Sequence, residues 1–153
     1  MRLTILAAVA AAFVGILFSE GAMAGDLSAS ANQTFLAANA TKQGVVTRPS
    51  GLQYRVIKTG KGKTPKTTDE VLTSYKGSLI DGTVFDQTQP GVTTKFEVGK
   101  VIPGWTEALT LMKEGDEWEL VIPSNLGYGE RGYPGAIPPN QTLVFEVTLV
   151  QVK

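Results

Sequence analysis

The chain has 153 residues, enough for one domain with a real hydrophobic core and too few for two. Lysine and arginine together number 14, as do aspartate and glutamate, so no excess of charge favours nucleic acid or an anionic membrane as a partner. The sequence has no cysteine and no histidine, which excludes thiol nucleophiles, disulfides, imidazole bases and the usual zinc ligands.

The first 24 residues have the pattern of a secretory signal peptide. Arg2 precedes an apolar run from Leu3 to Phe18, and the tripeptide "AMA" that ends at Ala24 matches an A-x-A cleavage site. The alternative is a membrane anchor, but the run is shorter than the ~20 residues that a spanning helix needs. We therefore expect cleavage after Ala24 and a mature protein that is periplasmic or secreted, without membrane association.

Residues 25–49 are expected to form a leader outside the core. The segment is rich in Ala, Ser, Asn and Thr, which are common in tails and loops, and its one candidate helix runs from Asn32 to Lys42. We expect this leader to be partly flexible. The folded domain is then expected to occupy residues 50–153.

From Leu52 onward the hydrophobic pattern is that of β-strands. In "LQYRVIKT" the residues Leu52, Tyr54 and Val56 alternate with polar ones, which places them on one face of a strand. Asp81-Gly82 is a hairpin signal between two later strands. Further strands are predicted at residues 70–80, 83–86, 93–99, 116–123 and 142–152.

One segment changes to a helical period. Trp105, Ala108, Leu109 and Met112 follow at i, i+3, i+4 and i+7, which predicts an amphipathic helix of about three turns. About five antiparallel strands with one short helix on their apolar face make an α+β domain. Between the last two strands stands the loop "GYGERGYPGAIPPN", residues 127–140, whose four glycines and double proline are too strongly patterned for a simple linker.

Three stretches, "YKGSLIDGTVFD", "GKVIPGWTEALTLMKEGDEWELVIPSNLGYGERG" and "IPPNQTLVFEVTLV", occur in this order. Together they resemble the FKBP family of peptidyl-prolyl cis-trans isomerases, the immunophilins that bind tacrolimus and rapamycin. The resemblance runs from about Gly51 to Lys153. The leader ending in "PSGLQYRVI" is similar to that of the macrophage infectivity potentiator group, whose members often carry a long helical dimerisation segment. Only about two dozen residues are available for one here, so we predict a monomer.

The resemblance implies a half-wrapped antiparallel sheet with the helix across its concave face and an apolar pocket between them. Trp105 would form the pocket floor, and the backbone N–H of Ile102 and the hydroxyl of Tyr128 would donate hydrogen bonds to ligand carbonyls. Asp86 would lie at the pocket edge. The walls would be Tyr75, Phe85, Val101, Ile102 and Phe145, and the rim Tyr128, Tyr133 and Ile137.

The activity implied by the resemblance is the rotation of Xaa-Pro bonds in unfolded or folding polypeptides, with no metal and no cofactor. Such rotation breaks no bond, and an apolar pocket favours the twisted amide because that amide has lost part of its charge separation. Without proton transfer, we expect catalysis to be nearly flat from about pH 6 to 8.5, with Asp86 ionised throughout.

Two features depart from the family pattern. The family often has an aromatic residue at the position of Thr94 and often an arginine in the preceding loop, where this chain has "QTQPGVTT". Both differences affect the expected affinity for macrolides of the tacrolimus and rapamycin type, which the resemblance implies as inhibitors. The alternatives to an isomerase are a peptide-binding or chaperone module of the same fold with little activity, and a secreted adhesin-like β domain. A hydrolase is disfavoured because no imidazole base is present.

Overall fold

The computed structural model describes residues 25–153, so the expected signal peptide and its cleavage site lie outside the described part. None of the helices within residues 25–153 is long and apolar enough to cross a membrane. The elements are, in chain order, the helix α2 (Ala29–Ala40), the strands β1 (Val45–Thr47), β2 (Gln53–Lys58), β3 (Glu70–Ser78), β4 (Val84–Gln87) and β5 (Thr94–Glu97), the 3-10 helix η3 (Val98–Lys100), the helix α3 (Pro103–Leu109), the strand β6 (Glu117–Ile122), the 3-10 helix η4 (Ser124–Leu126) and the strand β7 (Leu143–Val152).

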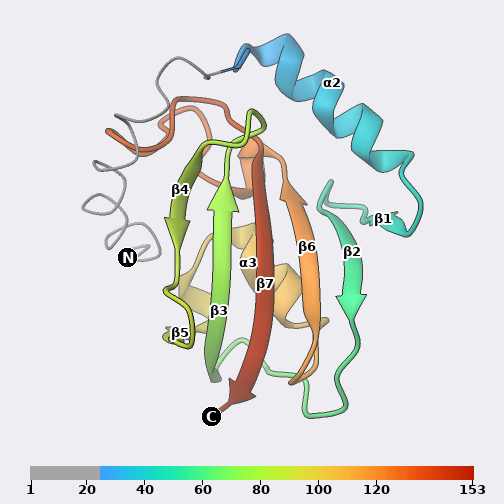
Figure 1. Ribbon diagram of the computed structural model, residues 1–153, viewed down its shortest axis with the longest axis vertical. Helices are drawn as coiled ribbons and strands as arrows, with labels where there is room; N and C mark the ends of the chain where they lie inside the picture. Colours follow the sequence, from blue (N-terminus) through green and yellow to red (C-terminus); the bar gives the residue numbers. More distant parts are fainter. Residues whose placement is uncertain (1–24) are drawn as a thin grey trace.

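The strands form one antiparallel sheet with α3 against one face (Figure 1). The strand order is β1-β2-β6-β7-β3-β4, and β5 pairs with β3 beyond the end of β4. The long last strand β7 therefore lies between β6 and β3, which agrees with the α+β fold expected from the sequence. The described part of the chain has seven strands rather than about five: the six segments that the sequence pattern marked as strands, and a short edge strand, β1, within the expected leader.

The core lies between α3 and the sheet. Trp105, Ala108, Leu109 and Met112, the apolar face predicted from the helical period, are each at most 1% exposed. The helix itself is shorter than predicted and ends at Leu109. Beyond this point the hydrogen bonds mix two patterns: the Leu111 N–H donates to the Ala108 carbonyl at 2.9 Å, and the Met112 N–H donates to the carbonyls of Ala108 at 3.1 Å and Leu109 at 3.3 Å, so Met112 reaches the core from a turn.

Strand β2 differs from the alternation predicted for it. Val56 is 47% exposed, whereas Gln53 is only 5% exposed, so the predicted apolar face is wrong at both positions. The reason is tertiary. The side-chain amide of Gln53 is covered by α2, where its Nε2 donates to the carbonyl of Leu36 at 3.0 Å and its Oε1 accepts from Nδ2 of Asn39 at 2.7 Å.

Helix α2 attaches the leader to the domain through buried amides at both of its ends. Asn32 donates from Nδ2 to Oε1 of Gln141 at 3.2 Å and accepts at Oδ1 from the N–H of Thr142 at 2.8 Å. Asn32 and Asn39 are 4% and 3% exposed. Residues 29–47, which the sequence analysis assigned to the leader, thus form a docked helix and a paired strand.

The boundaries of this helix also differ from the sequence prediction. It begins at Ala29, where the hydroxyl of Ser28 caps it by accepting from the N–H of Ala31 at 3.1 Å, and it ends at Ala40 rather than at residue 42. Figure 1 shows α2 beyond one end of the sheet, apart from α3.

The loop of residues 127–140 is a compact hairpin. Tyr133 and Ile137 exchange two backbone hydrogen bonds of 2.8 Å each. Gly129, Gly132 and Gly135 have φ values of 59°, 62° and 86°, so the loop uses its glycines for left-handed turns as the sequence suggested. The N–H of Asn140 donates to the Gly129 carbonyl at 2.8 Å and thereby closes the base of the loop.

Candidate active site

An aromatic cluster surrounds Trp105 on the inner face of the sheet. The indole is fully buried, and edge-to-face contacts join it to Tyr75 of β3 at a ring-centroid distance of 5.1 Å and to Phe145 of β7 at 5.3 Å. Phe85 of β4 contacts Phe145 in the same way at 5.5 Å. The structure thus brings together four aromatic residues that the sequence placed in the floor and walls.

Two residues that the sequence analysis did not single out complete this cluster. Phe96 of β5 contacts both Trp105, at a centroid distance of 5.5 Å, and Tyr75, at 5.9 Å. It lies two residues after Thr94, so strand alternation could have placed the two on one face. Gly77 of β3 lies under the rings, because a Cβ there would come within 2.8 Å of Phe85 and 2.6 Å of Phe145.

Val101 and Ile102 precede α3 and are both buried. The Ile102 carbonyl accepts from the N–H groups of Trp105 at 2.9 Å and Thr106 at 3.1 Å, and Pro103 occupies the first helical position. This cap fixes the Ile102 backbone beside the indole. The N–H of Ile102 itself donates to no other residue within the range 25–153.

The rim residues come from the 127–140 hairpin. Tyr128 and Tyr133 pack edge to face at a centroid distance of 5.9 Å, and Ile137 is 3% exposed. The hydroxyl of Tyr128 is buried and makes no hydrogen bond to any described residue. Burial, together with the nearby Asp86 carboxylate, raises the pKa of Tyr128 far above its ordinary value, so the hydroxyl stays protonated and able to donate.

Asp86 is 5% exposed at the end of β4 and accepts a 2.6 Å hydrogen bond from the hydroxyl of Tyr75. Burial raises the pKa of Asp86 to about 7, although hydrogen bonds from Tyr75 and the Gln87 backbone act in the opposite direction. The prediction that Asp86 stays ionised from pH 6 to 8.5 is therefore wrong. Its carboxyl group joins none of the ion pairs found within residues 25–153.

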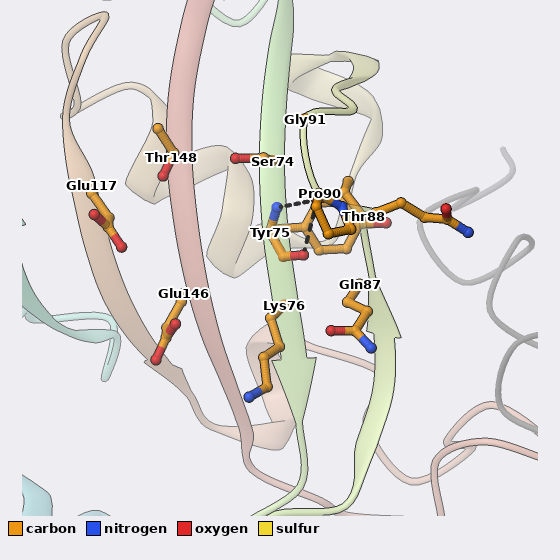
Figure 2. Close-up of a pocket in the computed structure, with 11 residues that line it drawn as sticks. Ser74, Tyr75, Lys76, Gln87, Thr88, Pro90, Gly91, Glu117, Glu146 and Thr148 are labelled. Carbon is orange, nitrogen blue, oxygen red and sulfur yellow. Dashed lines mark hydrogen bonds between the residues drawn. The ribbon is translucent and has the colours of Figure 1, made fainter. Parts of the chain in front are cut away.

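Thr88 fixes the start of the loop that contains no arginine. Its hydroxyl accepts from the N–H of Tyr75 at 3.0 Å, and its own N–H donates to the Tyr75 carbonyl at 2.9 Å. Tyr75 and Thr88 line a hollow of about 640 Å³. Figure 2 shows Lys76 and Glu146, which also line it, projecting from β3 and β7. The hollow lies on the sheet face away from α3 and shares one lining residue, Tyr75, with the aromatic cluster.

The geometry favours ligand binding over acid–base chemistry. The cluster offers apolar ring surfaces next to two buried donors with no partner in the described chain, the Ile102 N–H and the Tyr128 hydroxyl. Buried donors are nearly always paired, so both are available to an acceptor that a ligand would supply, as is the unpaired indole N–H of Trp105. No group of histidine, cysteine, aspartate or glutamate within residues 25–153 is arranged to hold a metal ion.

Comparison with known proteins agrees with this arrangement. Residues 61–150 match the model of the FKBP-type peptidyl-prolyl cis-trans isomerase family, and residues 7–56 match the domain amino-terminal to such isomerases. The chain is 55% identical over 119 residues to the FKBP-type 22 kDa peptidyl-prolyl cis-trans isomerase of Escherichia coli strain K12, covering 77% of this chain and 58% of that protein. It is 52% identical over 120 residues to the outer membrane protein MIP of Legionella longbeachae, covering 78% of this chain and 52% of that protein.

Solved structures give the same result. The crystal structure of FkpA from Escherichia coli matches with a TM-score of 0.78 and 46% identity, covering 81% of this chain and 58% of that one. A peptidyl-prolyl cis-trans isomerase from Pseudomonas syringae pv. tomato matches with a TM-score of 0.78 and 36% identity, covering 85% of this chain and 99% of that one. The chain spans about half the length of the two sequence relatives. By sequence and by structure, it belongs to the family of FKBP-type peptidyl-prolyl cis-trans isomerases.

Proposed function

We propose that this protein is a peptidyl-prolyl cis-trans isomerase that accelerates rotation about Xaa-Pro bonds in unfolded and folding polypeptides. The observation that carries the proposal is the pair of unpartnered buried donors, the Ile102 N–H and the Tyr128 hydroxyl, beside the aromatic floor of Trp105. Backbone carbonyl groups that flank a proline are the acceptors that such donors would hold.

The proposed mechanism lowers the barrier to rotation by desolvation. The barrier of ~18–20 kcal/mol arises from amide resonance, which gives the planar bond its charge separation. At the twisted transition state this resonance is lost, so the bond depends less on water and is favoured in an apolar pocket. The prolyl ring would lie on Trp105 between Phe85 and Phe145, while the donors hold the neighbouring carbonyls as the bond turns.

The remaining site residues have positioning and rim roles in this proposal. Asp86 accepts a hydrogen bond from the Tyr75 hydroxyl and so fixes Tyr75, which is one wall of the pocket. Val101 and Ile102 supply the wall next to the helix start. Tyr133 and Ile137 form the rim, where they would contact the client chain on either side of the proline.

The location and assembly of the protein follow from the same reasoning. We propose that cleavage after Ala24 releases a periplasmic or secreted protein, because residues 1–24 have the pattern of a signal peptide. We also propose that the mature protein is a monomer. Macrolides of the tacrolimus and rapamycin type would compete for the aromatic pocket. Thr94 replaces an aromatic group of the family there, so their affinity should be lower than where the aromatic residue is present.

An exchange assay on short Xaa-Pro peptides tests the function. Catalysed exchange that rapamycin suppresses is the expected result, and a Tyr128→Phe variant should retain less of it. A folded protein that binds proline peptides but leaves their exchange rate unchanged would contradict the proposal. That outcome would favour the alternative of a peptide-binding module with little isomerase activity.

A further inference from the structure

The described chain begins with a contact that joins two distant segments. The N–H of Gly25 donates to Oδ2 of Asp81 at 3.0 Å, and Oδ1 of the same carboxylate accepts from the N–H of Thr83 at 2.9 Å. Asp81 lies in the turn between β3 and β4. Burial raises the pKa of Asp81, but the hydrogen bonds from Thr83 and Gly25 outweigh this and hold the pKa below its ordinary value, so the group is a carboxylate at neutral pH.

The fit at this contact requires glycine. A Cβ on Gly25 would lie 2.9 Å from the Cβ of Asp81, closer than two such atoms approach in proteins. A larger residue would therefore push the backbone nitrogen away from the carboxylate. The same glycine is the residue that cleavage after Ala24 would leave at the amino terminus.

The residues that follow are held against the back of the rim loop. Leu27 lines a groove of about 520 Å³ with Leu79 of the turn and the Pro134–Pro139 segment of the hairpin. The Leu27 carbonyl accepts from Nε2 of Gln141 at 3.0 Å and from Nδ2 of Asn32 at 3.3 Å. Leu27 therefore supports, from outside, the hairpin that carries the rim residues.

Cleavage would change the chemistry of the contact without moving it. In the precursor the Gly25 nitrogen is a neutral amide with one hydrogen to donate. After cleavage it is an amino group with an ordinary pKa of ~7.7–8.0, hence mostly a cation with three donors at neutral pH. The other charged groups near this end are Asp26, its exposed neighbour, and Arg131, which lines the same groove as Asp81.

We propose that the α-ammonium group of Gly25, created by cleavage after Ala24, forms an ion pair with the Asp81 carboxylate and anchors the leader in the mature protein. The precursor lacks this charged contact, so processing completes the attachment of the leader to the β3–β4 turn and, through Leu27, to the rim hairpin. The inference rests on the proposed processing and is independent of the proposed isomerase activity.

A double-mutant cycle on the processed protein tests the ion pair. One alanine is inserted between Ala24 and Gly25, which leaves the "AMA" site intact and adds one residue ahead of Gly25 after cleavage. Intact mass verifies the new terminus. The insertion is expected to lower Tm by about 2–4 °C in the natural background, the size of one surface ion pair in a domain of this length. In Asp81→Asn, which keeps an acceptor for Thr83, the insertion should lower Tm no further.

Asp69→Asn is the matched control, because Asp69 also caps a turn by accepting the N–H of Lys66 but lies in an exposed loop. The insertion should lower Tm in that variant as much as in the natural chain. Equal losses in the Asp81→Asn and Asp69→Asn backgrounds would overturn the proposal. So would an intact mass that shows cleavage at a position other than Ala24.

The titration of the α-amino group gives a second readout that a purely structural role of Asp81 would not change. The pKa of the α-amino group can be measured from the Cα chemical shift of Gly25. It should lie above ~8 in the processed protein and should be lower in Asp81→Asn. An equal pKa in both proteins would overturn the proposal. Exchange activity on a short Xaa-Pro peptide should stay within about twofold of the natural protein in all variants. If neither the natural protein nor any variant had exchange activity, the proposed isomerase function would be contradicted and the ion pair would not.

Discussion

At the scale of single residues, Trp105 is expected to contribute to both catalysis and stability. Trp105→Leu keeps an apolar side chain but removes the ring surface that Tyr75 and Phe145 contact edge to face. We expect kcat/KM for a Xaa-Pro peptide to fall about 10–100-fold, which corresponds to ~1.4–2.7 kcal/mol of lost transition-state stabilisation. The unfolding free energy should also fall by about 1–3 kcal/mol because a cavity forms.

Trp118→Leu is the control for this change. Trp118 of β6 is 5% exposed and stacks on Tyr54 at a centroid distance of 4.2 Å, outside the aromatic cluster around Trp105. Its replacement should reduce stability in denaturant titrations and leave kcat/KM close to that of the natural protein. Equal kinetic losses in both variants would show that the site has been misplaced.

Tyr128 offers a test in which activity and stability change in opposite directions. Its hydroxyl is buried and unpaired among the described residues, so Tyr128→Phe removes a polar group that the fold does not use. The unfolding free energy should stay constant or rise slightly. If the hydroxyl holds a substrate carbonyl, kcat/KM should fall about 5–10-fold, the value of one neutral hydrogen bond of ~1 kcal/mol. Tyr54→Phe should leave kcat/KM unchanged.

Asp86 makes both stability and activity depend on pH. Its pKa is about 7 in the folded state and ~3.9 when unfolded. Between these values the folded state binds more protons than the unfolded state, so the contribution of Asp86 to stability falls as pH rises from about 4 to 7. Asp86→Asn removes this dependence. The Tm of the variant minus that of the natural protein should therefore increase between pH 4.5 and pH 8.

The same titration should appear in the kinetics. In the natural protein kcat/KM should change modestly with a midpoint near pH 7. At this pH the carboxyl group of Asp86, which accepts the hydrogen bond from the Tyr75 hydroxyl, loses its proton. In Asp86→Asn the profile should be flat, because the variant lacks the carboxyl group of Asp86. A bell-shaped profile that persists in the variant would indicate general acid–base catalysis and contradict the desolvation mechanism.

At the scale of elements, α2 depends on amide pairs rather than on an apolar stripe. Asn39→Ala leaves Oε1 of Gln53 without its 2.7 Å donor in a buried position. We expect a loss of about 1–3 kcal/mol in the free energy of unfolding, the usual cost of an unsatisfied buried group. Gln33→Ala on the exposed side of the same helix should change stability by less than ~0.5 kcal/mol. If both substitutions had similar effects in denaturant titrations, the docking of α2 would contribute nothing to the free energy of unfolding.

Helix α3 is only two turns long, and its position depends on what precedes it. The Ile102 carbonyl and Pro103 start the helix, and the Thr106 hydroxyl donates to the Val98 carbonyl at 2.7 Å. The Thr106 contact ties the helix start to η3. The element that carries the pocket floor is therefore fixed through its first turn, next to the unpaired Ile102 N–H.

At the scale of the whole molecule, the proposed removal of residues 1–24 determines where the mature chain begins. If residues 1–24 are removed, protein collected from the periplasm or the medium should have the intact mass of residues 25–153 and elute as a monomer. Retention of residues 1–24 in that fraction would contradict the proposed location. Elution as a dimer would contradict the predicted assembly and leave the location unaffected.

The amino-acid sequence by itself determined the α+β class, the positions of six strands and three of the aromatic residues around Trp105, namely Tyr75, Phe85 and Phe145, but not Phe96. These features depend on the local alternation of apolar and polar residues and on an ordered set of motifs, both of which can be recognised in the sequence. Tertiary structure decided the docking of α2, the burial of Gln53 and the titration of Asp86. Asn32 and Gln141 stand 109 positions apart, and hydrogen bonds between amides leave no periodic signal. The pKa of Asp86 likewise depends on how much water the folded chain removes from it, which no local pattern records.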